Sequence, residues 1–321
     1  MTVRKKTKAL LLYSGGLDSI LAAKILEGQE INITALTFVS HFFDAEQAKK
    51  SAKENGVELR IIDFSDKHLD VVKNPRFGRG SGMNPCIDCH LLMLKVAKKI
   101  SKIGTFLRTQ KDSTFIATGE VLGQRPMSQN LKALKLIEKK AGLAGKILRP
   151  LSARVLPETE MEKSGMVDRK KLLGISGRSR KKQLALAEKF GIKYFPTPAG
   201  GCILTDKGYS KKLQALIENV AKIKKSDIEL LRIGRHFWIG EDLPAGRQAR
   251  IILGRNHEEN LRLKNLAENG DILLEPKNIP GPTALIRGRK SKAVQVFAKK
   301  MLLKYTKGTG EELQFKIIAR K

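Results

Sequence analysis

Apolar and polar residues alternate along the first half of the chain in short blocks that predict strands and helices in turn. Apolar runs predict four strands, and stretches with apolar residues at helical spacing predict helices. The predicted strands cover residues 8–13, 32–39, 58–64 and 113–118, and the predicted helices cover 19–26, 45–54, 91–100 and 178–190. Because this alternation pairs strands in parallel, we expect an α/β fold with a doubly wound sheet, whose ligands gather beyond the carboxyl ends of the strands.

Two parts of the sequence depart from that regular alternation. Residues 67–85 are basic and contain several glycines, which predicts an irregular stretch. After about Thr205 the pattern becomes a Lys-rich helix followed by short strands at 237–240 and 249–253. We therefore expect a catalytic domain over residues 1–205 and a smaller α+β domain over residues 206–321.

The charge of the chain points to a polyanionic partner. Its 321 residues include 62 Lys and Arg against 32 Asp and Glu, a formal net charge of +30. A merely solvated surface would carry matching acids, whereas binding to phosphates explains the excess of cations. Aromatic residues make up only 5% of the chain, which argues against base-stacking platforms and favours recognition of a folded RNA.

A membrane is the other polyanion to consider, and the sequence argues against it. No apolar run approaches the ~20 residues that a spanning helix needs. The basic start of the chain precedes only a short apolar run, Ala9 to Tyr13, which is too short for a signal peptide core. We therefore expect a cytoplasmic protein, in which three cysteines are not a disulfide framework.

The turn between the first strand and the first helix has the composition of a phosphate-binding loop. It runs Ser14-Gly15-Gly16-Leu17-Asp18-Ser19. Gly15 and Gly16 let the backbone approach a ligand, and the free amides at the helix start favour an anion. The hydroxyls of Ser14 and Ser19 add donors, and Asp18 can orient Mg²⁺ or cap the helix. A simple turn needs only one glycine and one capping residue, so we interpret this loop as functional.

The three cysteines, Cys86, Cys89 and Cys202, allow several chemistries. Cys86-x-x-Cys89-His90 matches the c-type haem motif, but that group requires export. A zinc site could use the three thiols with His90. Three thiolates without a fourth suit a [4Fe–4S] cluster with one open iron, which can bind exogenous sulfide. The rival is a persulfide on one cysteine that a second cysteine resolves as a disulfide.

Two motifs resemble one known family. Ser14–Ser19 resembles the pyrophosphate-binding loop of the PP-loop ATP pyrophosphatases, which have a Rossmann-like fold, transfer AMP from ATP and release pyrophosphate. Thr118-Gly119-Glu120, Gln124 and Ser128-Gln129 are similar to a stretch of the 4-thiouridine synthetase branch, and the cysteine pattern resembles that of cluster-dependent tRNA thiolation enzymes. In the related 2-thiouridylases a carboxylate usually stands in the place of Cys86.

The resemblance implies roles for particular residues. Asp18, Cys89 and Cys202 would be catalytic, and Cys86, Cys89 and Cys202 would hold the cluster. ATP and Mg²⁺ would lie on Ser14, Gly15, Gly16, Asp18, Ser19, Thr37, Phe38, Gly119 and Gln124, with the end of the second strand facing the adenine. Glu120 would bind Mg²⁺ or cap the loop, and the sequence does not decide between these roles.

The second domain also carries a resemblance. Residues 249–288 resemble the RNA-binding module of the NFACT proteins. We therefore expect an ATP-dependent tRNA sulfurtransferase that adenylates a uridine or cytidine carbonyl oxygen and replaces that oxygen with sulfur. No cysteine follows Cys202, so we expect a separate sulfur donor, either a cysteine desulfurase or free sulfide. The alternatives are a metal-free persulfide relay, a PP-loop ligase for a small molecule, and a non-catalytic RNA-binding protein.

Overall fold

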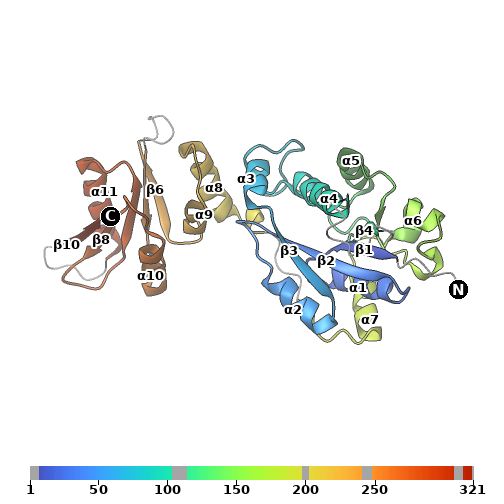
Figure 1. Cartoon of the computed structure of the whole chain (residues 1–321). Coiled ribbons are helices and arrows are strands. Elements are labelled where there is room, and N and C mark those ends of the chain that lie inside the picture. The colour runs from blue at the N-terminus through green and yellow to red at the C-terminus, as the bar shows by residue number, and fades with distance from the viewer. Residues whose placement is uncertain (1–6, 103–113, 197–201, 241–247, 307–313, 320–321) are drawn as a thin grey trace. The chain divides into compact units, whose positions relative to one another are not determined.

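The chain folds into two compact units, Met1–Ile203 and Leu204–Lys321 (Figure 1). The computed structural model describes residues 7–102, 114–196, 202–240, 248–306 and 314–319. Each unit is described by itself below. No helix in these described ranges is both long enough and apolar enough to cross a lipid bilayer.

Unit 1 contains a five-stranded parallel sheet with the strand order β3-β2-β1-β4-β5. Its strands are β1 (Lys8–Leu12), β2 (Asn32–Val39), β3 (Glu58–Asp63), β4 (Thr114–Thr118) and β5 (Ile147–Leu148). In the register of the central strand, Lys8 faces Asn32 of β2 and Thr114 of β4. This sheet confirms the predicted α/β class and places the carboxyl ends of all the strands at one edge.

Helices cover both faces of this sheet (Figure 1). The helices of unit 1 are α1 (Leu17–Glu27), α2 (Glu46–Asn55), α3 (Ser65–Lys73), α4 (Cys86–Lys102), α5 (Leu131–Ala141), α6 (Glu160–Lys163) and α7 (Lys181–Lys189). Alternate residues of β1 enter two separate cores. Leu11 packs with α1, α2 and α7, whereas Leu10 packs with α4 and α5. Burial on both faces explains why the strands are almost continuously apolar.

One expectation for unit 1 is wrong. Residues 67–73, expected to be irregular, form most of α3. This helix buries His68, Leu69 and Val72, which lie on one face at helical spacing. Charged residues fill the positions between them, so the apolar pattern is too short and too interrupted to stand out in the sequence. The following residues, 74–85, form no helix or strand.

Unit 2 is built on a five-stranded antiparallel sheet with the order β10-β8-β9-β7-β6. Its strands are β6 (Arg235–Ile239), β7 (Ala249–Leu253), β8 (Ile272–Pro276), β9 (Ala284–Gly288) and β10 (Phe315–Ala319), and its helices are α8 (Lys207–Asn219), α9 (Lys225–Leu230), α10 (His257–Leu266) and α11 (Lys292–Tyr305). One face of the sheet packs on α11, and the other packs on α9 and α10. The predicted α+β class of this domain is confirmed.

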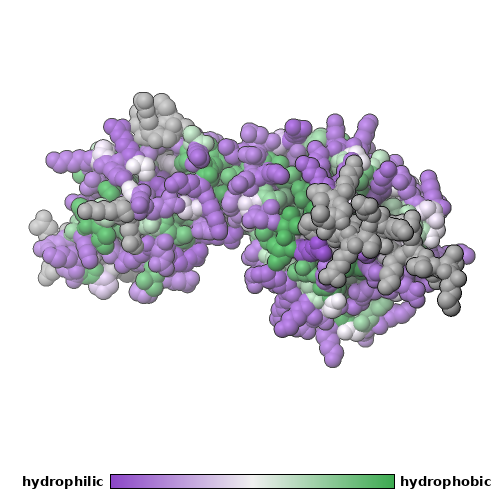
Figure 2. Space-filling model, in the orientation of Figure 1, coloured by the Kyte–Doolittle hydropathy of each residue, from purple (hydrophilic) through white to green (hydrophobic). Residues whose placement is uncertain are grey.

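The surfaces of the two units are mainly hydrophilic on the face that Figure 2 shows. Some of the charged side chains of unit 2 nevertheless lie inside. Arg250 is 2% exposed, and its guanidinium donates to the carbonyl of Asp227 at 3.2 Å. Arg287 pairs with Asp227 at 2.9 Å and with Asp271 at 2.7 Å. These two arginines therefore stabilise the fold and are not part of a polyanion-binding surface.

Candidate active site

The glycine turn has the geometry of an anion site. Gly16 is the N-cap of α1, and its amide donates to Ser14 Oγ at 3.3 Å. The Ser19 hydroxyl donates back to the Gly16 carbonyl at 2.8 Å. Gly15 has φ +74°, and a Cβ there would lie 2.7 Å from the Cα of Ala48 at the start of α2. Only glycine fits this position, and the first amides of α1 are left to face a ligand.

The loop after β4 packs directly on this turn. A Cβ on Gly119 would lie 2.7 Å from the backbone nitrogen of Ser19 and 2.8 Å from the carbonyl oxygen of Asp18. Gln124 Nε2 donates to Asp18 Oδ2 at 2.7 Å, and Gln183 Nε2 donates to Gln124 Oε1 at 3.1 Å. Two motifs about 100 residues apart in sequence therefore form one site, as expected for loops at the carboxyl edge of a parallel sheet.

One carboxylate oxygen of Asp18 has no hydrogen-bond partner in the described part of the chain. Its Oδ1 atom is buried and makes no hydrogen bond among the described residues. Burial raises the pKa of Asp18, while the hydrogen bond from Gln124 and the positive charges of Arg180 and Arg125 lower it. A buried carboxylate oxygen without a partner suits a hard cation such as Mg²⁺. The residues present therefore fit a magnesium ion that would accompany ATP.

The end of β2 is largely occupied by contacts within the protein. The Thr37 hydroxyl donates to the carbonyl of Tyr13 at 2.6 Å. Phe38 is 6% exposed, and its ring lies 5.2 Å from that of Phe64, measured between centroids. Both side chains are committed to the core, so these two residues can offer a nucleotide only their backbone.

The first turn of α4 carries two of the three thiols. Cys86 and Cys89 both lie in this turn, which confirms that they share the start of a helix. Burial raises the pKa of Cys89, and the neighbouring Cys202 and Cys86 raise it further. Burial also raises the pKa of Cys86, while the positive charge of Arg125 opposes this shift. The three thiols, none of which forms a disulfide, therefore share one neighbourhood.

The three cysteines supply the donor atoms that an iron–sulfur cluster needs, but their side chains are not already arranged as a metal site in the described part of the chain. Three thiolates are the donors that an iron–sulfur cluster prefers, and Cys89 packs against the apolar core formed with α4. In the part of the chain that the structure describes, however, no three His, Cys, Asp or Glu side chains are grouped as metal ligands. Residues 197–201, which precede Cys202, lie outside the described ranges.

Glu120 is held by protein partners. Its carboxylate accepts from Arg149 Nε at 2.9 Å and lies 2.8 Å from His90 Nδ1. Burial would raise the pKa of Glu120, but Arg149 and His90 outweigh it and bring the pKa to about 2. Of the roles left open for Glu120, capping and positioning therefore agree with the structure better than binding Mg²⁺. Arg149, whose side chain is 4% exposed, is buried rather than a surface cation.

Two residues at this site carry no distinct signal in the sequence. Arg125 acts electrostatically on both Asp18 and Cys86, where its positive charge opposes the rise in pKa that burial causes. Gln183, from α7, supports Gln124. Arg125 directly follows Gln124 in the chain, but nothing in that adjacency indicates the direction of its side chain.

Helix α11 of unit 2 has a face of exposed lysines that make no ion pair within the described ranges. Lys292, Lys300 and Lys304 of α11 are exposed and lie at helical spacing on one side; we call them the α11 lysines. By contrast, Lys212 donates to the carbonyls of Leu231 and Gly234, at 3.2 and 2.9 Å. The basic runs of the sequence therefore include lysines that bond to backbone carbonyls of the fold and lysines whose side chains are exposed to solvent.

Two parts of the chain match models of known protein families. Residues 5–154 match the model of the thiamine biosynthesis protein (ThiI) family. Residues 234–320 match the model of the NFACT protein RNA binding domain.

Curated relatives match part of the chain at 25–29% identity. A probable tRNA sulfurtransferase of Caldanaerobacter subterraneus subsp. tengcongensis is 27% identical over 153 residues, which span 45% of this chain and 36% of the relative. The tRNA-specific 2-thiouridylase MnmA 1 of Fusobacterium nucleatum subsp. nucleatum is 25% identical over 244 residues, spanning 71% of this chain and 61% of the relative. The chain thus matches less than two thirds of the length of either protein.

Solved structures show more distant likeness. A 4-thiouridine synthetase–RNA complex with bound ATP has a TM-score of 0.37 and 20% identity, covering 70% of this chain and 52% of that one. The U34-tRNA thiolase NcsA from Methanococcus maripaludis, with its [4Fe-4S] cluster, has a TM-score of 0.30 and 16% identity, covering 72% and 73%. On these matches, residues 5–154 are similar to the ThiI family and residues 234–320 are similar to the NFACT RNA-binding domain.

Proposed function

We propose that the chain is an ATP-dependent tRNA sulfurtransferase. One observation carries this proposal: His90, next to Cys89, lies 2.8 Å from Glu120, and Gly119, beside Glu120, packs on the nucleotide turn, which supports a single site for the turn and the thiols. A ligase for a small molecule has no use for such thiols, and a protein that only binds RNA has no use for the nucleotide turn. The NFACT match and the excess of cations supply the RNA partner.

In the first step the nucleotide turn holds ATP. The free amides of α1 and the Ser14 hydroxyl bind its phosphates, and Asp18 Oδ1 would hold Mg²⁺. A uridine or cytidine carbonyl oxygen attacks the α-phosphorus. The bond from that phosphorus to pyrophosphate breaks, and pyrophosphate leaves with its charge stabilised by the turn. Arg125 and Arg180, whose charges act on Asp18, are placed to share this stabilisation.

In the second step sulfur displaces AMP. Sulfur attacks the activated base carbon, and the carbon–oxygen bond breaks, so the original oxygen leaves on AMP. Cys86, Cys89 and Cys202 would hold a [4Fe–4S] cluster, whose open iron supplies exogenous sulfide when the cluster is bound. The chain's own contribution is to shield this chemistry, because Cys89 packs among apolar residues of α4.

A metal-free persulfide relay is the second candidate for the sulfur step. It needs only two of the three thiols, one to carry the persulfide and one to resolve it as a disulfide. Anaerobic purification followed by iron analysis separates the two. A cluster predicts a brown protein with about four irons that Cys202→Ala removes. A colourless, iron-free protein that still thiolates tRNA would support the relay.

The whole proposal is tested by ATP–pyrophosphate exchange with and without bulk tRNA. We expect exchange that tRNA stimulates and that Asp18→Asn abolishes. Exchange indifferent to tRNA would indicate a small-molecule ligase, and no exchange under any condition would indicate an RNA-binding protein. Mass spectrometry of nucleosides from the reacted tRNA then identifies the thiolated base.

A further inference from the structure

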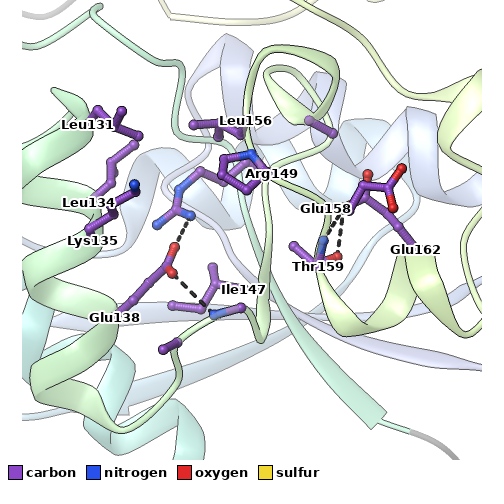
Figure 3. Close-up of a pocket in the computed structure, with 14 residues that line it drawn as sticks. Leu131, Leu134, Lys135, Glu138, Ile147, Arg149, Leu156, Glu158, Thr159 and Glu162 are labelled. Carbon is purple, nitrogen blue, oxygen red and sulfur yellow. Dashed lines mark hydrogen bonds and ion pairs between the residues drawn. The ribbon is translucent and has the colours of Figure 1, made fainter.

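A pocket of about 420 Å³ lies beside the active site of unit 1, between α5 and the segment that leads from β5 to α6 (Figure 3). Its walls are mainly apolar and include Leu131, Leu134, Ile147 and Leu156. Leu131 stands at the start of α5 with 42% of its surface exposed. An open pocket of this size with apolar walls is suited to a flat organic group.

Arg149 brings an unused donor to this pocket. Its Nε atom donates to Glu120 at 2.9 Å and its Nη1 atom to Glu138 at 2.5 Å. The remaining Nη2 atom is buried and has no hydrogen-bond partner among the described residues. Figure 3 shows the guanidinium reaching toward α5, where Glu138 lies. Because a buried N–H without an acceptor is costly, a ligand whose acceptor reached this atom through a small shift of the pocket wall would be stabilised.

The charges around the pocket favour a neutral hydrogen-bond acceptor over a negatively charged one. Four carboxylates, Glu120, Glu138, Glu158 and Glu162, lie at the pocket against three cations, Lys135, Arg149 and Arg169, the last of which pairs with Glu158 and Glu162. A phosphate or carboxylate ligand would meet this excess of negative charge. A neutral carbonyl oxygen would accept from Nη2 without that repulsion.

The pocket is separate from the reaction itself. Its lining includes none of the cysteines and no residue of the nucleotide turn. Arg149 nevertheless contacts Glu120, whose neighbour Gly119 packs on Asp18. An occupant would therefore lie close to the reacting nucleotide without facing ATP or the thiols.

We propose that this pocket binds a second, non-reacting base of the RNA, with a ring carbonyl of that base accepting from Arg149 Nη2. The inference rests on the proposed function, because an RNA substrate is what brings bases to this edge of the sheet. A pyrimidine offers both required features, a flat apolar face and a neutral carbonyl. The pocket thus selects tRNA by a base near the one that reacts.

The test uses uridine, which carries no phosphate, and saturation-transfer NMR on the full chain without ATP. Leu131→Trp fills the mouth of the pocket from an exposed position, and Lys132→Trp, at the next and equally exposed position outside the lining, is the matched control. We expect uridine binding to weaken at least tenfold in Leu131→Trp and to stay unchanged in Lys132→Trp.

Several results would overturn the inference. These are no uridine signal from the wild type, equal signals from both variants, displacement of uridine by benzoate, or a stronger signal from N-acetylleucinamide, which would indicate a peptide site. ATP–pyrophosphate exchange is measured on the same samples. Exchange without uridine binding refutes only the base pocket, whereas uridine binding without exchange refutes the proposed enzyme and leaves a nucleoside site.

Discussion

The contact between Gly119 and the first turn of α1 leads to a quantitative prediction for Gly119→Ala. The added Cβ would lie 2.7 Å from Ser19 N and 2.8 Å from two backbone atoms of Asp18. Ordinary contact begins near 3.4 Å, so one of the two loops must move by about 0.7 Å. Both partners are backbone, so no flexible side chain can absorb the shift.

Two effects should follow from this displacement. Overpacking of this kind costs about 1–3 kcal/mol, and each kcal/mol lowers the Tm of a domain of this size by roughly 2–4 °C. The moved loop also carries Gln124, which would lose its 2.7 Å hydrogen bond to Asp18. We therefore expect a melting temperature lower by several degrees and MgATP binding weaker by at least tenfold.

Differential scanning fluorimetry and titration calorimetry with MgATP measure the two effects. Gly174→Ala is the control, because a Cβ there would meet only ordinary contacts, the nearest being Arg154 Cβ at 3.4 Å. If Gly119→Ala kept both the melting temperature and the ATP affinity of the wild type, the two motifs would not form the single site described here.

Three further predictions concern charge. Asp18→Asn should weaken ATP binding at least tenfold with Mg²⁺ present and little without it, because the amide lacks the charge that would hold the ion. The melting temperature should stay unchanged, because burial already disfavours the charged form of Asp18 and raises its pKa. Calorimetry with and without Mg²⁺ that gave equal affinities for variant and wild type would contradict the magnesium role. Glu120→Gln should cost about 3–5 kcal/mol of unfolding free energy at pH 7. The pKa of Glu120 in the folded protein is about 2, below the ordinary 4.5, so the contribution of its charge to stability is full above about pH 4.5 and is lost as the pH falls toward 2. The free energies of unfolding of variant and wild type, measured in urea, should therefore converge at low pH. A constant difference across the pH range would refute the pairing. Replacing the α11 lysines with alanine should reduce the slope of log affinity for tRNA against log salt by about one unit per lysine that contacts a phosphate. The control Lys224→Ala should change this slope little, because Lys224 already pairs with Glu268 at 2.9 Å. Equal slopes for the α11 variant and the wild type in filter-binding assays would exclude α11 as the interface.

The sequence predicts the frame of unit 1 well because its strands are buried on both faces. Apolar runs at 8–13 and 32–39 correspond to β1 and β2 within one residue. The glycine turn was also predictable, because a backbone that approaches an anion closely requires glycines and favours hydroxyl side chains. By contrast β5, with only Ile147 and Leu148, is too short to leave a pattern, and α3 hides its apolar face among charges.

Side-chain partnerships within the site could not be predicted. Glu120 and Arg149 lie 29 residues apart, and each has the appearance of a surface charge in the sequence. Their pairing follows from the adjacency of β4 and β5, which only the fold establishes. The same holds for Arg125, whose neighbours Asp18 and Cys86 come from two other elements.

The separate cores of the two units have a consequence for how the substrate is captured. Among the described residues, two apolar clusters lie within unit 1 and two lie within unit 2, so each unit has a core of its own. If unit 2 grips the RNA, the covalent tether presents that RNA to unit 1 at an effective concentration in the millimolar range, as is typical of short linkers. The nucleotide-binding unit then needs little intrinsic affinity for RNA, and cutting the chain between the units would abolish turnover at low tRNA concentration while sparing it at high concentration.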